Sequence, residues 1–142
     1  MEKNEKKVYK AVNEPIKNYE AGSNEKKTIK DQLIKMSQEI IEIPIIIGGK
    51  EIKTGNLGKC VMPHNHQHIL AHYHKASVNE INLAIDNLLT TWKSWSNTSI
   101  EHRIGIFKRM AELLQGPYRD IINASTMLGQ SKNIFQAEID SA

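Results

Sequence analysis

The sequence predicts a mainly α-helical fold with short antiparallel strands on its N-terminal side. Two observations predict it. Apolar residues follow a period near two between about residues 43 and 75, and a period near 3.6 after Ser77. In addition, two capping boxes, Ser77-Val78-Asn79-Glu80 and Thr98-Ser99-Ile100-Glu101, mark the starts of helices in the second part of the chain.

The composition excludes several classes of protein. The chain has 142 residues, of which 39% are hydrophobic, and a formal net charge of +3 from 19 basic and 16 acidic residues. Nucleic-acid-binding domains gather basic residues on one face, and this nearly balanced mixture does not favour such a role. No apolar run approaches the roughly 18 residues that span a bilayer, so we expect no membrane insertion. The single cysteine excludes an internal disulfide and fits a reducing compartment.

Residues 1–27 are predicted to form a flexible charged leader. The segment is rich in lysine, contains acids and has almost no large apolar residues, which favours a solvated chain. It has no arginine and carries Glu2, Glu5 and Glu14. Mitochondrial transit peptides are rich in arginine and poor in acids, so this leader is at best an atypical one.

Helix and strand patterns alternate in the next part of the chain. Residues 28–42 place four apolar residues at helical spacing, which predicts a short amphipathic helix; they are Ile29, Leu33, Met36 and Ile40. The β-branched run at residues 43–47 predicts a strand, and Gly48-Gly49 predicts a turn after it. Further strands are expected at residues 51–54, 59–62 and 69–75.

The helix that follows Ser77 is predicted to carry one apolar stripe. Its members are Val78, Ile81, Ile85, Leu88, Leu89, Trp92 and Trp95. A second helix is expected to begin near Ile100 and to end at Gly116-Pro117, because glycine and proline commonly follow the last helical turn.

Two more helices are expected near the C-terminus. Pro117 can start a third helix that runs to about Leu128, with Gly129 as its stop. A fourth begins near Asn133 and is still running at Ala142, with no glycine or proline to end it. We therefore expect the chain to be the front part of a larger fold.

An ordered set of short motifs carries a family resemblance. The motifs are Asn13-Glu14-Pro15, Ile43-Pro44, Gly48-Gly49-Lys50-Glu51-Ile52, Thr54-Gly55-Asn56, Pro63 with Asn65, His66 and His68, Thr126-Met127, Gly129-Gln130, Lys132 and Gln136-Ala137-Glu138-Ile139-Asp140. With them, the chain resembles the N-terminal region of the aldehyde dehydrogenases and, within that family, the Δ1-pyrroline-5-carboxylate (L-glutamate γ-semialdehyde) dehydrogenases. The residues that depart from this pattern are His64, His72, His74 and Ser131. At Ser131 the subfamily usually has glycine, so a turn that needs a positive φ is expected to be strained there.

The resemblance implies an α/β enzyme of the aldehyde dehydrogenase family. Residues 28–142 then form an incomplete layer of hairpin and helices from its nucleotide-binding domain. The implied reaction oxidises L-glutamate γ-semialdehyde to glutamate with NAD, in proline catabolism. The implied location is the mitochondrial matrix, or the cytoplasm if the leader does not target. In this family the nucleophile, the base and the NAD contacts lie beyond residue 142, so we assign no catalytic, cofactor-binding or metal-binding residue, and expect this chain alone to be inactive and without bound NAD.

Several other residues are of types that can form catalytic or binding sites. Cys60 is the only thiol, but it lies in a predicted hairpin and does not match the nucleophile motif of the family. Glu138 and Asp140 lie on a predicted helix without an identified partner, and we interpret them as surface charges or members of ion pairs. Gly48-Gly49-Lys50 lacks the spacing of a phosphate loop. Trp92 and Trp95 are interpreted as core or subunit-contact residues.

The segment at residues 63–75 holds five of the six histidines and raises the question of a metal site. In an extended strand, His64, His66, His68, His72 and His74 share one face, and imidazoles at i and i+2 can chelate zinc or copper. No acidic residue lies within the run to orient them. We interpret the segment as a strand and turn whose exposed positions are histidine.

Three functional hypotheses remain open from the sequence. The chain is the N-terminal part of an NAD-dependent γ-semialdehyde dehydrogenase, with a small aldehyde as the substrate of the whole enzyme. Alternatively, it is a non-catalytic interaction module that associates with itself or with full-length dehydrogenase subunits. As a third alternative, it is a small metal-binding protein that uses the histidine run.

Overall fold

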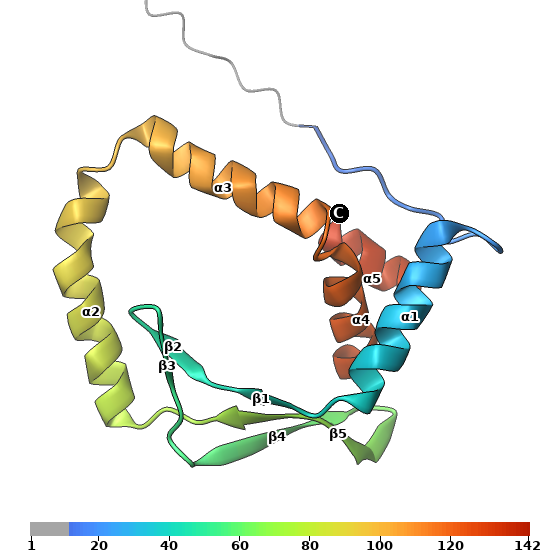
Figure 1. Ribbon diagram of the computed structural model, residues 1–142, viewed down its shortest axis with the longest axis horizontal. Helices are drawn as coiled ribbons and strands as arrows, with labels where there is room; N and C mark the ends of the chain where they lie inside the picture. Colours follow the sequence, from blue (N-terminus) through green and yellow to red (C-terminus); the bar gives the residue numbers. More distant parts are fainter. Residues whose placement is uncertain (1–11) are drawn as a thin grey trace, which may run out of the picture.

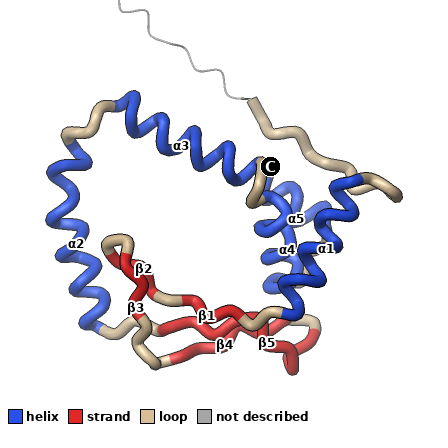
Figure 2. The backbone as a smooth tube through the Cα atoms, in the orientation of Figure 1, coloured by secondary structure: helices blue, strands red, loops and turns tan. Residues whose placement is uncertain are grey.

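The computed structural model describes residues 12–142, in which the strands lie at one side of the molecule and the first helix and the last two gather beside one end of them (Figure 1). One helix comes first, five short strands follow, and four helices complete the described chain (Figure 2). The elements are α1 (Asn24–Gln38), β1 (Ile41–Ile43), β2 (Ile45–Ile47), β3 (Lys50–Ile52), β4 (Leu57–Met62), β5 (Asn65–His74), α2 (Val78–Ser96), α3 (Ile100–Gln115), α4 (Arg119–Gln130) and α5 (Ile134–Ser141).

The strands form two small sheets. In the larger sheet β5 is central, with β4 antiparallel on one side and β1 parallel on the other. The expectation of purely antiparallel strands is therefore wrong for β1. The single strand predicted at residues 43–47 is also wrong, because the chain is split at Pro44, which has no amide hydrogen to donate to a ladder. Its second part, β2, pairs with β3 as a separate hairpin.

The turn between β2 and β3 confirms the role predicted for its two glycines. Gly48 and Gly49 have φ values of 58° and 75°, the conformation that two-residue hairpin turns need and that residues with a Cβ rarely adopt. A Cβ on Gly48 would also lie 2.6 Å from the side-chain nitrogen of Asn87 on α2. The glycine thus lets α2 approach the hairpin closely.

The N-terminal segment is more ordered than its composition suggests. α1 begins at Asn24, inside the predicted leader, so the boundary at residue 27 is wrong, and Tyr19 is buried although this segment was expected to be solvated. The side chain of Ser23 accepts a hydrogen bond from the backbone amide of Lys26, a local N-cap that fixes the start of the helix four residues earlier than expected. The predictions for residues 1–11 lie outside the described part of the chain.

α2 and α3 form an arch that leads from the sheet to α4 (Figure 1). Ser77 and Glu80 make the predicted capping box at the start of α2. At α3 the cap is Ser99, whose hydroxyl accepts from the amide of His102, and not Thr98 as the motif suggested. Neither helix has a buried residue. The predicted apolar stripe of α2 is thus exposed in this chain. No described helix is long and apolar enough to cross a membrane.

The core lies where α1, α4 and α5 meet (Figure 2). It consists of Tyr19, Ile29 and Ala124, and the apolar side chains packed around it are Leu33, Met36, Met127 and Ile134. α4 does not stop at Gly129 as predicted but continues to Gln130. The left-handed residue that ends it is Ser131, with φ 56° and ψ 28°, so the expectation of a positive φ at this serine is confirmed.

Candidate functional site

The most deeply buried polar residues of the described chain surround one ion pair. Arg119 is the first residue of α4 and Glu138 lies in the middle of α5, and their exposed fractions are 1% and 0%. The guanidinium contacts both carboxylate oxygens, through Nη2 to Oε1 and through Nε to Oε2 at 3.3 Å. Such a two-pronged contact is the strongest form of pairing between an arginine and a carboxylate.

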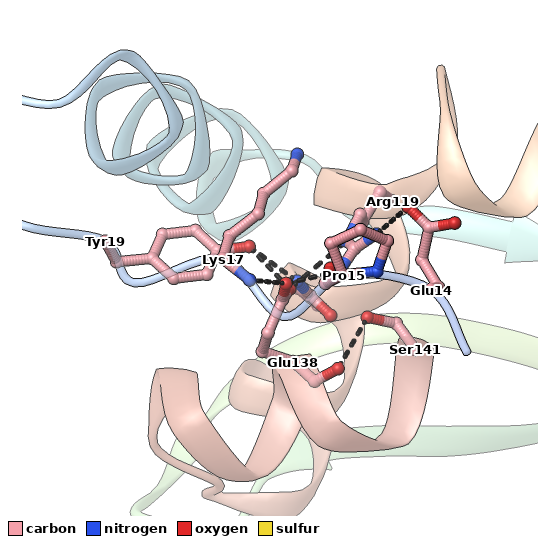
Figure 3. Close-up of polar contacts among 8 residues, drawn as sticks. Glu14, Pro15, Lys17, Tyr19, Arg119, Glu138 and Ser141 are labelled. Atoms are coloured by element: carbon pink, nitrogen blue, oxygen red, sulfur yellow. Dashed lines mark hydrogen bonds and ion pairs between the residues drawn. The ribbon is translucent and has the colours of Figure 1, made fainter. Parts of the chain in front are cut away.

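Three more groups donate hydrogen bonds to the Glu138 carboxylate (Figure 3). The backbone amide of Lys17 donates to Oε1 at 2.7 Å. The Tyr19 hydroxyl donates to Oε2 at 2.7 Å, and Asn123 Nδ2 donates to the same oxygen at 2.8 Å. With Arg119, two donors therefore reach Oε1 and three reach Oε2, which compensates the carboxylate for its removal from water.

The far side of Arg119 holds the N-terminal segment. Its Nη1 pairs with the Glu14 carboxylate at 3.0 Å, and its Nη2 donates to the Pro15 carbonyl at 2.8 Å. Tyr19, which ends this stretch, has a φ of 53°, a strained value for an aromatic residue. The network thus ties residues 14–19 to α4 and α5, and we refer to Glu14, Pro15, Lys17, Tyr19, Arg119, Asn123 and Glu138 as the Arg119 cluster.

The ionisation of the Arg119 cluster is fixed by these contacts. Burial alone raises the pKa of Glu138, but hydrogen bonds from Arg119, the Lys17 amide, Tyr19 and Asn123 outweigh it and lower the pKa to about 2. Burial and the bond to Glu138 raise the pKa of Tyr19. The bond to Glu138 also raises the pKa of Arg119. A general base needs a pKa near the working pH, so Glu138 is unsuited to that role and serves as a structural anion.

The two acids weighed from the sequence have different surroundings. Glu138 forms an ion pair, as one of the interpretations held, but it lies in the core and not at the surface. Asp140 forms an ion pair with Lys132, and the side chains of both are partly exposed. The sequence did not identify Arg119, Tyr19 or Asn123 as the partners of Glu138.

Among the described residues, no three His, Cys, Asp or Glu side chains lie close enough together to hold a metal ion. His64 lies in the turn before β5 and contacts the Ser131 hydroxyl through Nδ1 at 2.8 Å. The expectation that the side chains of the histidine run are exposed is wrong for His74, because only 8% of this residue is exposed. Its Nδ1 accepts from the amide of Gly55 at 3.1 Å, and its Nε2 lies 2.8 Å from Glu42.

The pairing of Glu42 with His74 was missed by the sequence reasoning, which looked for acids only inside the run. Because Nδ1 of His74 accepts a backbone hydrogen bond, the ring hydrogen lies on Nε2 and points at the Glu42 carboxylate. Hydrogen bonds from His74 and Lys53 lower the pKa of Glu42. The arrangement joins β1, β5 and the turn at Gly55, which is a structural role.

The other sequence candidates also have structural surroundings. Cys60 lies on β4 and is half-buried. With Ser125 and Gly129 of α4, it borders an apolar cavity of about 210 Å³ between the helices and the sheet. Trp92 and Trp95 are 54% and 42% exposed, so they are not core residues of this chain.

The chain is similar in sequence to the members of one known protein family. The aldehyde dehydrogenase family model matches residues 52–142. The chain is 40% identical over 131 residues to the mitochondrial delta-1-pyrroline-5-carboxylate dehydrogenase of Dictyostelium discoideum, covering 92% of this chain and 24% of the relative. It is 36% identical over 133 residues to the human mitochondrial enzyme of that name, covering 94% of this chain and 24% of the relative.

A solved structure shows the same arrangement of elements. The delta-pyrroline-5-carboxylate dehydrogenase of Mycobacterium tuberculosis, crystallised with NAD and cobalamin, superposes with a TM-score of 0.91 at 33% identity. The superposition covers 96% of this chain and 25% of the mycobacterial chain. The chain therefore spans about a quarter of the length of the relatives that it matches.

Proposed function

Because this chain belongs to the aldehyde dehydrogenase family, we propose that it supplies the N-terminal layer of an enzyme that oxidises L-glutamate γ-semialdehyde to glutamate with NAD. One observation carries the proposal: nearly the whole chain superposes on a delta-pyrroline-5-carboxylate dehydrogenase that was crystallised with NAD. The similarity extends through residues 126–142, which include the Arg119 cluster member Glu138. In this proposal the Arg119 cluster stabilises the packing of residues 14–19 against α4 and α5, and the rest of a subunit packs against this N-terminal layer.

The described residues do not fit NAD by themselves. A dinucleotide site needs a glycine-rich turn between a strand and a helix, with backbone amides that converge on the phosphates. Here the Gly48-Gly49 turn joins two antiparallel strands, and the side chain of Asn87 occupies the space beside Gly48. We therefore assign NAD binding and the chemical step to the remaining three quarters of an aldehyde dehydrogenase subunit.

This division of roles predicts that the 142-residue chain has no dehydrogenase activity. Its one thiol, Cys60, lies in a strand beside the apolar side chains of Leu70 and Leu128. Its most buried carboxylate among the described residues, Glu138, is held as an anion by Arg119. Covalent aldehyde oxidation needs a thiolate with a base in reach, and these two residues belong to separate parts of the fold.

A chimera tests the proposal directly. This chain replaces the matching quarter of the mycobacterial enzyme, and NADH formation from γ-semialdehyde is followed by absorbance. We expect a folded chimera to be active and to keep its activity when Cys60 is replaced by serine. The chain alone should give no NADH above background. A chimera that folds, as judged by circular dichroism, yet stays inactive would contradict the proposal.

The exposed face of α2 favours interaction with full-length subunits as a second candidate function. Leu88, Trp92 and Trp95 are 68%, 54% and 42% exposed on a helix without a buried residue. Patches of this kind mark surfaces that bind another protein. Co-purification of this chain with a full-length dehydrogenase, at a fixed stoichiometry and without an increase in activity, would favour this candidate over the first.

For the location, we propose the mitochondrial matrix. The relatives from Dictyostelium and human carry the word mitochondrial in their names. The alternative is the cytoplasm, if residues 1–11 do not target. Fluorescence microscopy of the tagged chain, with and without residues 1–11, distinguishes the two.

A further inference from the structure

A single side-chain contact joins two distant turns of this chain. His64 lies in the turn between β4 and β5, and Ser131 lies between α4 and α5, 67 residues later. Nδ1 of His64 is 2.8 Å from Oγ of Ser131. Both residues are exposed, so neither is held in place by burial.

Ser131 has a backbone conformation that a serine rarely adopts. Its φ of 56° and ψ of 28° place it in the left-handed region, where a Cβ crowds the following carbonyl. Helices that end in this conformation usually do so on glycine, which has no Cβ. Serine differs from glycine by a hydroxymethyl group, and the hydroxyl of that group makes the contact with His64.

We propose that the hydrogen bond between His64 and Ser131 is a latch that holds the left-handed end of α4 and fixes the α4–α5 junction against the β4–β5 turn. The junction matters because α5 begins three residues after Ser131. Asn133 caps α5 by exchanging hydrogen bonds with Gln136 at 3.0 Å in both directions. A junction that opens releases this cap first, and the position of Glu138 on α5 depends on it.

Amide hydrogen exchange on the 142-residue chain measures the latch locally. The reporters are the amides of Asn133, Gln136 and Ala137, each of which donates a hydrogen bond at the start of α5. The amides of α1 around the buried Ile29, which belongs to the core, serve as an internal reference for global opening. Four backgrounds are compared: the unchanged chain, His64→Ala, Ser131→Ala and Ser131→Gly.

A latch predicts a specific pattern of rates. His64→Ala should accelerate exchange at the reporters about three- to tenfold, the range for loss of one hydrogen bond. Ser131→Ala keeps the left-handed Cβ and loses the hydroxyl, so it should cause a similar acceleration. Ser131→Gly loses both, and its rates should be equal to or slower than those of the unchanged chain.

The double variants decide whether the two residues act through each other. Adding His64→Ala to either Ser131 variant should change the rates less than twofold, because the bond is already absent. His66→Ala is the matched control, since the side chain of this exposed neighbour makes no hydrogen bond to another described residue and its loss should change the rates less than twofold. Acceleration by His64→Ala that is equally large in the Ser131→Ala background overturns the proposal. So does a His64→Ala variant whose rates match those of the unchanged chain.

Discussion

Arg119 at the start of α4 donates hydrogen bonds to both carboxylate oxygens of Glu138 on α5, and this pair is the most completely buried ion pair among residues 12–142. The same guanidinium reaches Glu14 and the Pro15 carbonyl. One side chain therefore connects three segments that are distant in sequence. A buried pair of this kind is costly to form and more costly to break, because removing one partner leaves the other as an unpaired charge.

Glu138→Gln should strongly loosen the packing of α5 and the N-terminal segment. The amide keeps the shape of the side chain but removes the buried anion, which leaves the guanidinium of Arg119 with only the partly exposed Glu14 carboxylate as its partner. We expect a loss of about 3–5 kcal/mol in the free energy of opening, measured by native-state amide exchange in α4 and α5. The matched control is Asp140→Asn, which breaks the partly exposed pair with Lys132 and should cost less than about 1 kcal/mol. Equal effects of the two substitutions would contradict a special role for the Arg119 cluster.

Acid should weaken the fold through the same carboxylate. The pKa of Glu138 is about 2 in the folded chain, and an unfolded glutamate titrates near about 4.3. Because the folded pKa is the lower one, the stabilisation is fully present above the unfolded value and is lost as the pH falls toward 2. Circular dichroism between pH 6 and pH 2 should show this loss, and the dependence should be shallower in Glu138→Gln. Glu42 and Glu80, whose pKa values are also lowered, retain their own contributions in that variant.

The helices could be predicted because their signals are local. The capping box of α2 needs only Ser77 and Glu80, three residues apart, and the structure forms it. The displaced cap of α3 shows the limit of such motifs, since Thr98 and Ser99 are adjacent and chemically alike, and only backbone geometry selects the second.

The Arg119 cluster could not be predicted from local patterns. Tyr19 and Glu138 are separated by 119 residues, and nothing near Tyr19 in the sequence indicates that it is buried. One signal was available: Arg119 is the first residue of a helix, where the positive end of the helix dipole disfavours a cation. A cation at that position indicates a carboxylate partner from another segment. Glu138, for which the sequence analysis identified no partner, is that carboxylate.

Gly58→Ala should destabilise the β4–β5 sheet. A Cβ at this position would lie 2.2 Å from a carbon of the Tyr73 ring, which covers the glycine across the strand pair. Moving the ring should cost about 1–3 kcal/mol, measured as faster amide exchange in β4 and β5. Gly105→Ala provides the opposite control, because its Cβ meets nothing within 4 Å on α3 and alanine favours a helix by up to about 1 kcal/mol. A Gly58→Ala variant with unchanged exchange in both strands would show that the ring moves aside freely.

The exposed stripe of α2 should make this chain associate. Leu88 and Trp92 lie one helical turn apart and are 68% and 54% exposed, and each large apolar side chain left in water forgoes roughly 1.5–3 kcal/mol of burial. We expect dye binding, a broad thermal melt and concentration-dependent association in sedimentation experiments. Replacing both residues by glutamine should reduce dye binding and association, while Lys93→Gln on the same helix should leave both unchanged. A chain that is monomeric at high concentration, does not bind dye and melts sharply would show that the stripe needs no covering surface, and that the 142 residues form an independent domain.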